Sequence, residues 1–123
     1  MRFVIQRELA LLRPDADAST VQVEALLHPD FGEIDAAGRR LGRREVIAAF
    51  GRRAPRPPGN GGPPAAGPAA VSGLTGIRLS TTVILVSYLS DSGGRHVRCS
   101  SLWLKTGPSW RRYFHQATPV AAG

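Results

Sequence analysis

Residues 82–118 read TVILVSYLSDSGGRHVRCSSLWLKTGPSWRRYFHQAT, and this stretch decides the fold. It holds three strand-like runs, 82–90, 96–105 and 110–118, and a fourth such run, 71–79, comes just before it. The turn-forming segments 90–94 and 106–109 separate the last three runs, as expected of hairpins. Consecutive hairpins form an antiparallel sheet, so we predict such a sheet for the last third of the chain.

The first 51 residues have a different pattern. The spacing of Val4, Ile5, Leu9 and Leu12 predicts a helix over residues 3–12, and we expect further helices over 18–27 and 43–51. The buried side of the second helix is predicted to comprise Val21, Val23, Ala25, Leu26 and Leu27. A short strand over 31–35 and a return strand over 39–41 lie between the second and third helices. Helices followed by a β-meander indicate an α+β fold.

The whole chain of 123 residues has the length of a single domain. Residues 54–70 hold six of the ten prolines, which excludes a regular helix or an inner strand there. We expect a flexible Pro/Gly-rich surface loop in this segment, either a passive insertion or a lid over a pocket.

The net charge of +7 raises the possibility of nucleic-acid binding, and seven arginines gather between residues 39 and 56. That stretch contains one aromatic residue, Phe50, and no known nucleic-acid module, so a solvated basic face is the preferred interpretation. The single cysteine, Cys99, allows no internal disulfide and is interpreted as a small core residue. No apolar stretch is long enough to span a membrane and no signal-peptide pattern begins the chain, so we expect a cytoplasmic protein.

Three segments carry a family resemblance: 25–34 (ALLHPDFGEI), 38–50 (GRRLGRREVIAAF) and 100–119, which contains SSLW and WRRYFHQATP. Together they resemble the DUF4440 / SnoaL-like branch of the nuclear-transport-factor-2-like (NTF2-like) superfamily. The resemblance implies a cone in which helices pack on a curved antiparallel sheet around a small-molecule pocket. It also implies a homodimer paired through the outer sheet face. It carries little about function, because this fold hosts several kinds of enzyme and binding protein.

Two carboxylates, Glu33 and Asp35, are the sharpest candidates for chemistry. Residues two apart in a strand point to the same face, so Phe31, Glu33 and Asp35 share one face. If Phe31 faces the interior, both carboxylates face it too. A carboxylate in an apolar pocket can act as a general base or acid near neutral pH. In the alternative arrangement Ile34 faces inward, both carboxylates are solvated, and Asp35 only opens the turn at 36–38.

The resemblance adds a role for Asp35. The segment ending in Glu33-Ile34-Asp35 is similar to that of ketosteroid isomerase, and Asp35 falls on the general base of that family. The oxyanion-holding tyrosine of the family falls near Glu8, which does not replace it at neutral pH. The resemblance therefore argues against steroid isomerisation and leaves open a base-assisted reaction on another small molecule.

The later strands supply the remaining candidates for ligand contact: Tyr88, Ser101, Trp103, His115 and Gln116. Regular alternation on the last strand means that either His115 or Gln116 points inward. His115 would be a proton-transfer partner, and Gln116 would be a hydrogen-bonding anchor. The histidines and acids have no metal-binding spacing, so we expect neither a metal nor another cofactor.

The sequence therefore predicts a small-molecule-binding domain of NTF2-like type, with cofactor-free acid/base chemistry as its enzymatic form. The alternative is a non-catalytic ligand-binding or dimerisation module. A third hypothesis, anion binding by the arginine-rich stretch, predicts steep salt dependence of binding.

Overall fold

The computed structural model describes residues 1–12, 20–52 and 70–121. Three helices, α1 (Arg2–Leu12), α2 (Thr20–Leu26) and α3 (Arg43–Arg52), accompany six strands. The strands are β1 (Leu27–Ile34), β2 (Arg40–Gly42), β3 (Ala70–Ser80), β4 (Val83–Ser92), β5 (Arg95–Thr106) and β6 (Ser109–Pro119). The loop expected over 54–70 lies outside the described residues, except for Ala70, which begins β3.

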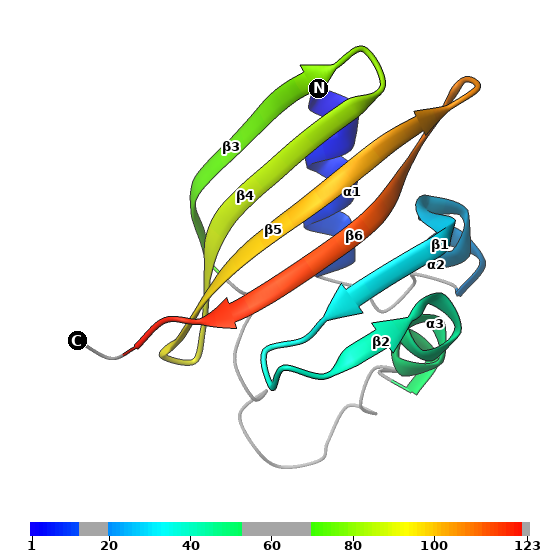
Figure 1. The fold of residues 1–123 in the computed structure, drawn as a ribbon. Helices are drawn as coiled ribbons and strands as arrows, with labels where there is room; N and C mark the ends of the chain where they lie inside the picture. Colours follow the sequence, from blue (N-terminus) through cyan, green and yellow to red (C-terminus); the bar gives the residue numbers. More distant parts are fainter. Residues whose placement is uncertain (13–19, 53–69, 122–123) are drawn as a thin grey trace, which may run out of the picture.

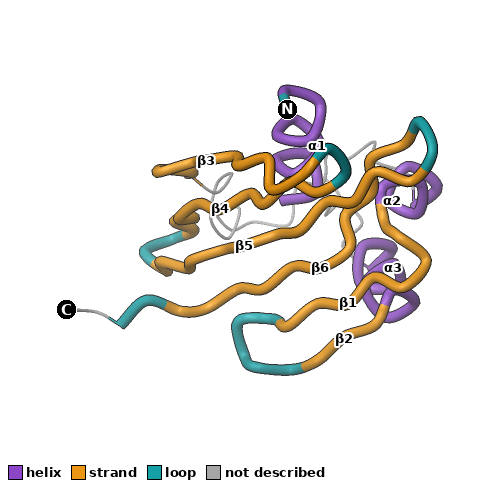
Figure 2. The backbone as a smooth tube through the Cα atoms, turned by 45° about the horizontal axis from the view of Figure 1, so that its top comes forward, coloured by secondary structure: helices purple, strands orange, loops and turns teal. Residues whose placement is uncertain are grey.

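The strands form one curved sheet in the order β2-β1-β6-β5-β4-β3 (Figures 1 and 2). The predicted meander is present, because β3, β4, β5 and β6 pair antiparallel with their neighbours in sequence. One pair departs from the expected antiparallel sheet, because β1 runs parallel to β6. The sheet is therefore mixed, and this parallel pair brings the strand with the two candidate carboxylates next to the last strand.

β1 is longer than predicted and follows α2 without a loop. Its register with β6 shifts between Leu27 and Gly32, and Pro29 lies inside this shift. Proline has no N–H to donate to a strand ladder, so a locally unpaired segment accommodates it.

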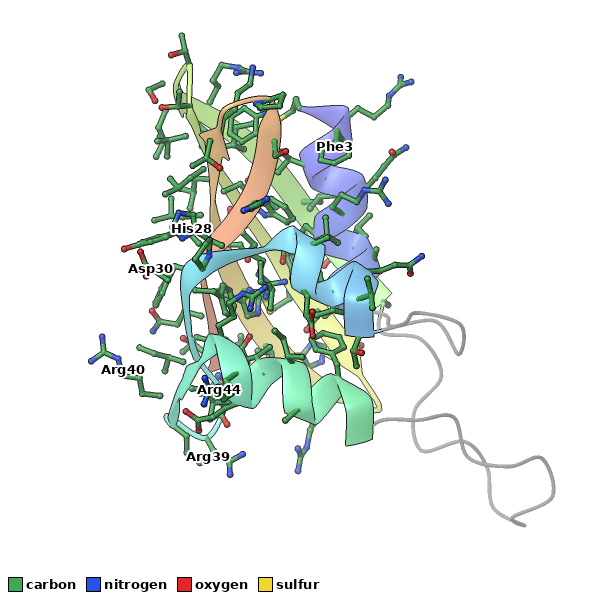
Figure 3. The ribbon with its side chains drawn as sticks, turned by 90° about the vertical axis from the view of Figure 1, so that its right-hand side faces the viewer. Phe3, His28, Asp30, Arg39, Arg40 and Arg44 are labelled. Carbon is green, nitrogen blue, oxygen red and sulfur yellow. The ribbon has the colours of Figure 1, made fainter. Side chains whose placement is uncertain are left out.

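All three helices lie on the same side of the sheet (Figure 3). α1 contacts β4, whereas α2 and α3 contact each other and β1. The core fills the space between the helices and this inner face of the sheet, and includes Val4, Val23, Phe31, Val46, Ile84, Val86 and Trp103. Cys99 is buried in the same core, as predicted, and burial raises the pKa of its thiol.

The buried faces of the first two helices differ from the prediction. The buried residues of α1 are Val4, Glu8 and Leu11. The prediction named Leu9 and Leu12 in place of Glu8 and Leu11, so the second half of the buried face lies one position earlier than expected. On α2 only Val23 is buried, and Val21 is 69% exposed, because the helix ends at Leu26 and turns just one side toward α3 and the sheet.

A β-bulge in β6 decides which side chains reach the interior. Ser101 pairs with His115, Leu102 with Phe114 and Trp103 with Arg112, so Tyr113 is an extra residue on β6. Without the bulge, residues three apart would face opposite sides of the sheet. With it, Arg112 and His115 both point toward the helices, where both are buried.

Candidate functional site

A cavity of about 1250 Å³ opens between the helices and the inner face of the sheet. Its apolar wall includes Leu11 and Leu12 of α1, Leu27 and Phe31 of β1, and Val46 and Phe50 of α3. Glu33, Tyr88, Arg112 and His115 supply polar groups to the same cavity. Apolar walls with a few polar groups are typical of small-molecule sites.

Glu8 is the centre of the buried polar groups and is fully inaccessible to solvent. The Tyr88 hydroxyl donates a hydrogen bond to its Oε2 at 2.6 Å, and the Trp103 indole N–H donates to its Oε1 at 2.9 Å. Burial alone would raise the pKa of Glu8, but the Arg112 charge and these two hydrogen bonds hold that pKa below its ordinary value. Glu8 is therefore a buried carboxylate anion that ties α1 to β4 and β5.

Arg112 lies between two carboxylates. Its guanidinium nitrogens are 3.6 Å from Oε2 of Glu8 and 3.8 Å from Oε1 of Glu33. The guanidinium also lies over the Phe31 ring, 5.7 Å from the centroid. Both carboxylate distances exceed the roughly 2.7–2.9 Å of a strong charged hydrogen bond. Arg112 lines the cavity, and its two long carboxylate contacts leave the terminal guanidinium N–H groups able to donate to a ligand there.

His115 is neutral at physiological pH. Burial, and then the nearby Arg112 charge, lower the pKa of His115 to about 3. Its Nδ1 lies 2.6 Å from the Ser101 hydroxyl and 3.7 Å from Oε2 of Glu8. Serine and glutamate thus meet the same ring nitrogen, whereas a Ser-His-acid triad needs them on opposite nitrogens. The arrangement is therefore not that of a serine hydrolase, and the other ring nitrogen, Nε2, is the one available to the cavity.

Of the two carboxylates predicted on β1, the structure places Glu33 against Arg112. Phe31 is 4% exposed and faces the helices, so the strand has the orientation that brings Glu33 to the cavity. The Glu33 side chain is 20% exposed. It is therefore accessible from the cavity without being fully solvated.

Asp35 lines the cavity near its mouth but is held by the turn that follows β1. Its carboxylate accepts hydrogen bonds from the backbone N–H groups of Ala37 and Arg39 and pairs with the Arg39 guanidinium at 2.9 Å. The backbone hydrogen bond from Arg39 is the largest cause that lowers the pKa of Asp35. This environment makes Asp35 a weaker base than an ordinary aspartate.

The other predicted residues divide by strand face. Tyr88 and Trp103 meet at Glu8, and Ser101 meets His115, so all three belong to the buried polar cluster with Glu8, Arg112 and His115. Gln116 pairs with Ser100, is exposed on the opposite face of β6, and does not line the cavity. Of the two residues in question on the last strand, His115 is the one that points inward.

Two members of this polar cluster were not among the predicted site residues. Val4, Glu8 and Leu11 are spaced i, i+4 and i+7, so they lie on one face of the helix. A charged residue between two apolar ones on that face is the signal by which Glu8 could have been found. Arg112 carries no such signal, because regular alternation places it on the face opposite His115 and only the bulge brings the two together.

The arginine-rich stretch separates into structural and exposed residues. Arg43 donates hydrogen bonds to the backbone carbonyls of Glu24 and Leu27. Arg39, Arg40 and Arg44 extend from the surface around β2 and the start of α3 (Figure 3). Among the described residues, no three His, Cys, Asp or Glu side chains gather as metal ligands. The described helices are also too short or too polar to cross a lipid bilayer.

No protein-family model matches the chain, and no curated protein matches it in sequence. Its fold is shared by solved structures. A protein of unknown function from Pectobacterium atrosepticum, of the DUF3225 family, is 18% identical with a TM-score of 0.72, and the match covers 98% of this chain and 87% of that one. An NTF2-like protein from Cytophaga hutchinsonii is 18% identical over 98% of both chains, with a TM-score of 0.62.

An NTF2-like protein of unknown function from Pseudomonas aeruginosa is 12% identical with a TM-score of 0.70, and the match covers 98% of this chain and 97% of that one. At these identities the likeness concerns the fold alone. The chain has the NTF2-like fold, an α+β cone, and this confirms the fold predicted from the sequence.

Replacing Glu8 with glutamine should destabilise the fold by about 3–5 kcal/mol, because Arg112 is then left in the core without its buried counter-charge. Urea denaturation followed by circular dichroism measures this loss. Glu24→Gln removes the same charge from the exposed face of α2 and should change stability by less than about 0.5 kcal/mol. An added Arg112→Met substitution should restore part of the stability lost in Glu8→Gln. Equal effects of Glu8→Gln and Glu24→Gln would contradict the structural role of Glu8.

Stability should fall as the pH drops from 6.5 towards 4.5, because the pKa of His115 moves from 6.5 to about 3 on folding and the unfolded chain binds the proton first. The slope from this group approaches about 1.4 kcal/mol per pH unit. Glu8, whose pKa is lowered from 4.5, adds to the same trend only at lower pH. His115→Gln should flatten the slope between these two pH values, and the exposed His96→Gln should leave it in place. A slope that survives in His115→Gln would refute the assignment.

Proposed function

We propose that this domain binds a small, largely apolar molecule in the cavity and holds the polar group of that molecule at Arg112 and His115. The observation that carries the proposal is a cavity of about 1250 Å³ with apolar walls and a buried, hydrogen-bonded polar cluster on one side. Pockets of this composition bury most of the surface of a ligand and fix its orientation through few polar contacts. The SnoaL-like assignment within the superfamily remains part of this proposal and rests on the three sequence segments.

The polar cluster is suited to receive a ligand because its geometry is set before binding. Glu8 fixes Tyr88 and Trp103 through short hydrogen bonds, and Ser101 fixes the His115 ring. Such preorganisation lowers the entropic cost of binding, because the side chains that contact the ligand are already ordered. Neutral His115 and cationic Arg112 then offer hydrogen bonds to oxygen or nitrogen atoms of the ligand.

The cavity can be blocked from α3 with a matched control. Ala49 lines the cavity and Ala48 is exposed next to it on the same helix. In a ligand-observed NMR screen of neutral aromatic fragments, wild type and Ala48→Trp should bind the same fragments, whereas Ala49→Trp should lose them by at least roughly tenfold in affinity. Fragments that bind all three proteins alike would show that they sit elsewhere and would contradict the proposal.

Acid/base catalysis is the enzymatic form of the same proposal, and Glu33 is its best-placed base. Glu33 borders the cavity beside Arg112, which can stabilise negative charge that develops on a substrate oxygen. Asp35 is committed to the turn and to Arg39. Of the two carboxylates predicted to transfer a proton, Glu33 is therefore the one that we propose as the base.

A row of apolar side chains supports a second proposal, that two copies of the chain pair through the outer sheet face. Ile77, Leu85, Leu102 and Phe114 are cross-strand partners in a line across four strands. We call them the outer apolar row. None of the four is fully buried, and Ile77 is 50% exposed. Partly exposed apolar side chains that adjoin one another across strands are a surface that a second copy of the chain can cover.

Light scattering coupled to size exclusion tests this pairing. Wild type should elute as a dimer, and Leu102→Lys should shift it towards the monomer because it places a charge in the middle of the row. Glu24→Lys changes an exposed residue of α2, on the opposite side of the sheet from the outer apolar row, and should leave the dimer intact. A monomeric wild type would remove the second proposal without affecting the first.

A further inference from the structure

The charge around Arg112 limits what the cavity can accept. Arg112 already faces two carboxylates, Glu8 at 3.6 Å and Glu33 at 3.8 Å. His115, which borders the same cavity, is neutral because burial lowers its pKa to about 3. A ligand anion that approached Arg112 would therefore bring a third negative charge to a single guanidinium.

We propose that the cavity selects uncharged ligands with a hydrogen-bond acceptor, such as a ketone, ester or amide, and that Glu33 is the residue that excludes carboxylates. This inference rests on the proposed ligand-binding function and names the class of ligand. Glu33 borders the side of Arg112 that a ligand would approach, since the guanidinium otherwise lies against Glu8 and the Phe31 ring, so the Glu33 charge acts on any carboxylate brought there.

A neutral acceptor does not meet this obstacle. A carbonyl oxygen can accept a hydrogen bond from Arg112 while the guanidinium keeps its attraction to both carboxylates. A carboxylate would gain the same hydrogen bond but would be repelled by Glu33 at short range, where low solvent access leaves the repulsion poorly screened. The difference between the two ligands is therefore electrostatic and originates in one side chain.

The exposed arginines that line the cavity within residues 1–12, 20–52 and 70–121 do not reverse this preference. Arg39 is paired with Asp35 at 2.9 Å, and its side chain is 74% exposed. Arg95 is the first residue of β5 and is exposed. Charges that exposed are screened by salt and water, so they attract anions to the mouth of the cavity more than to Arg112.

Glu8 and Glu33 differ in a way that makes the inference testable. Glu8 is fully buried and hydrogen-bonded to Tyr88 and Trp103, so its replacement disturbs the fold. Glu33 is partly exposed on β1, and glutamine keeps its shape while removing its charge. Glu33→Gln is therefore the informative variant. Asp30→Asn is its control, because Asp30 is an exposed acid on the same strand that points away from the body of the protein (Figure 3).

The probes are the methyl ketone of naphthalene and the corresponding naphthoate, which share a ring system and differ in charge. Isothermal titration calorimetry near pH 7 should show wild type and Asp30→Asn binding the ketone at least tenfold more tightly than the carboxylate. Glu33→Gln should reduce this preference by about tenfold or more, mainly through tighter binding of the carboxylate. Circular dichroism confirms that the three proteins are equally folded.

The outcomes distinguish the role of Glu33 in ligand selection from ligand binding by the cavity. Equal binding of ketone and carboxylate by wild type, or a preference that Glu33→Gln leaves unchanged, overturns the role of Glu33 while the proposed binding function stands. Failure of wild type and both variants to bind either probe counts against the binding function itself.

Discussion

The buried ion pair between Glu8 and Arg112 is the interaction on which the rest of the site depends. Glu8 comes from α1, and its partners come from β4, β5 and β6, so one carboxylate fixes the helix against three strands. Taking these charges out of water is costly and becomes tolerable only when hydrogen bonds satisfy them. Tyr88 and Trp103 provide such bonds to Glu8, while Arg112 makes only a long contact with Glu8 and also lines the cavity.

The bulge in β6 is the backbone feature that places neutral His115 beside the Glu8–Arg112 ion pair. It turns Arg112 and His115 to the same face although they are three residues apart in a strand. The Arg112 charge helps to keep His115 neutral, and the His115 ring in turn packs against Glu8. An irregularity of one residue therefore sets both the shape of the polar cluster and its charge, which is why bulges often occur beside functional sites.

The sequence predicts the fold better than the site, for physical reasons. The hairpin turns and the helical spacings are local signals, and they identify the meander and the three helices. The parallel pairing of β1 with β6 joins segments far apart in the chain, so no local pattern reveals it. Strand alternation correctly groups Phe31 with Glu33, but it separates Arg112 from His115 because it assumes an unbroken ladder. Glu8 is detectable on an apolar helix face, whereas its four partners depend on the tertiary arrangement.

The most direct test of the central claim is an NMR titration that follows the Arg112 side-chain N–H and the His115 ring nitrogens as a neutral aromatic ketone is added. If the cavity holds the ligand at these two residues, their signals should shift together and saturate at the same ligand concentration. Shifts confined to the outer apolar row, with the Arg112 and His115 signals unchanged, would contradict the account.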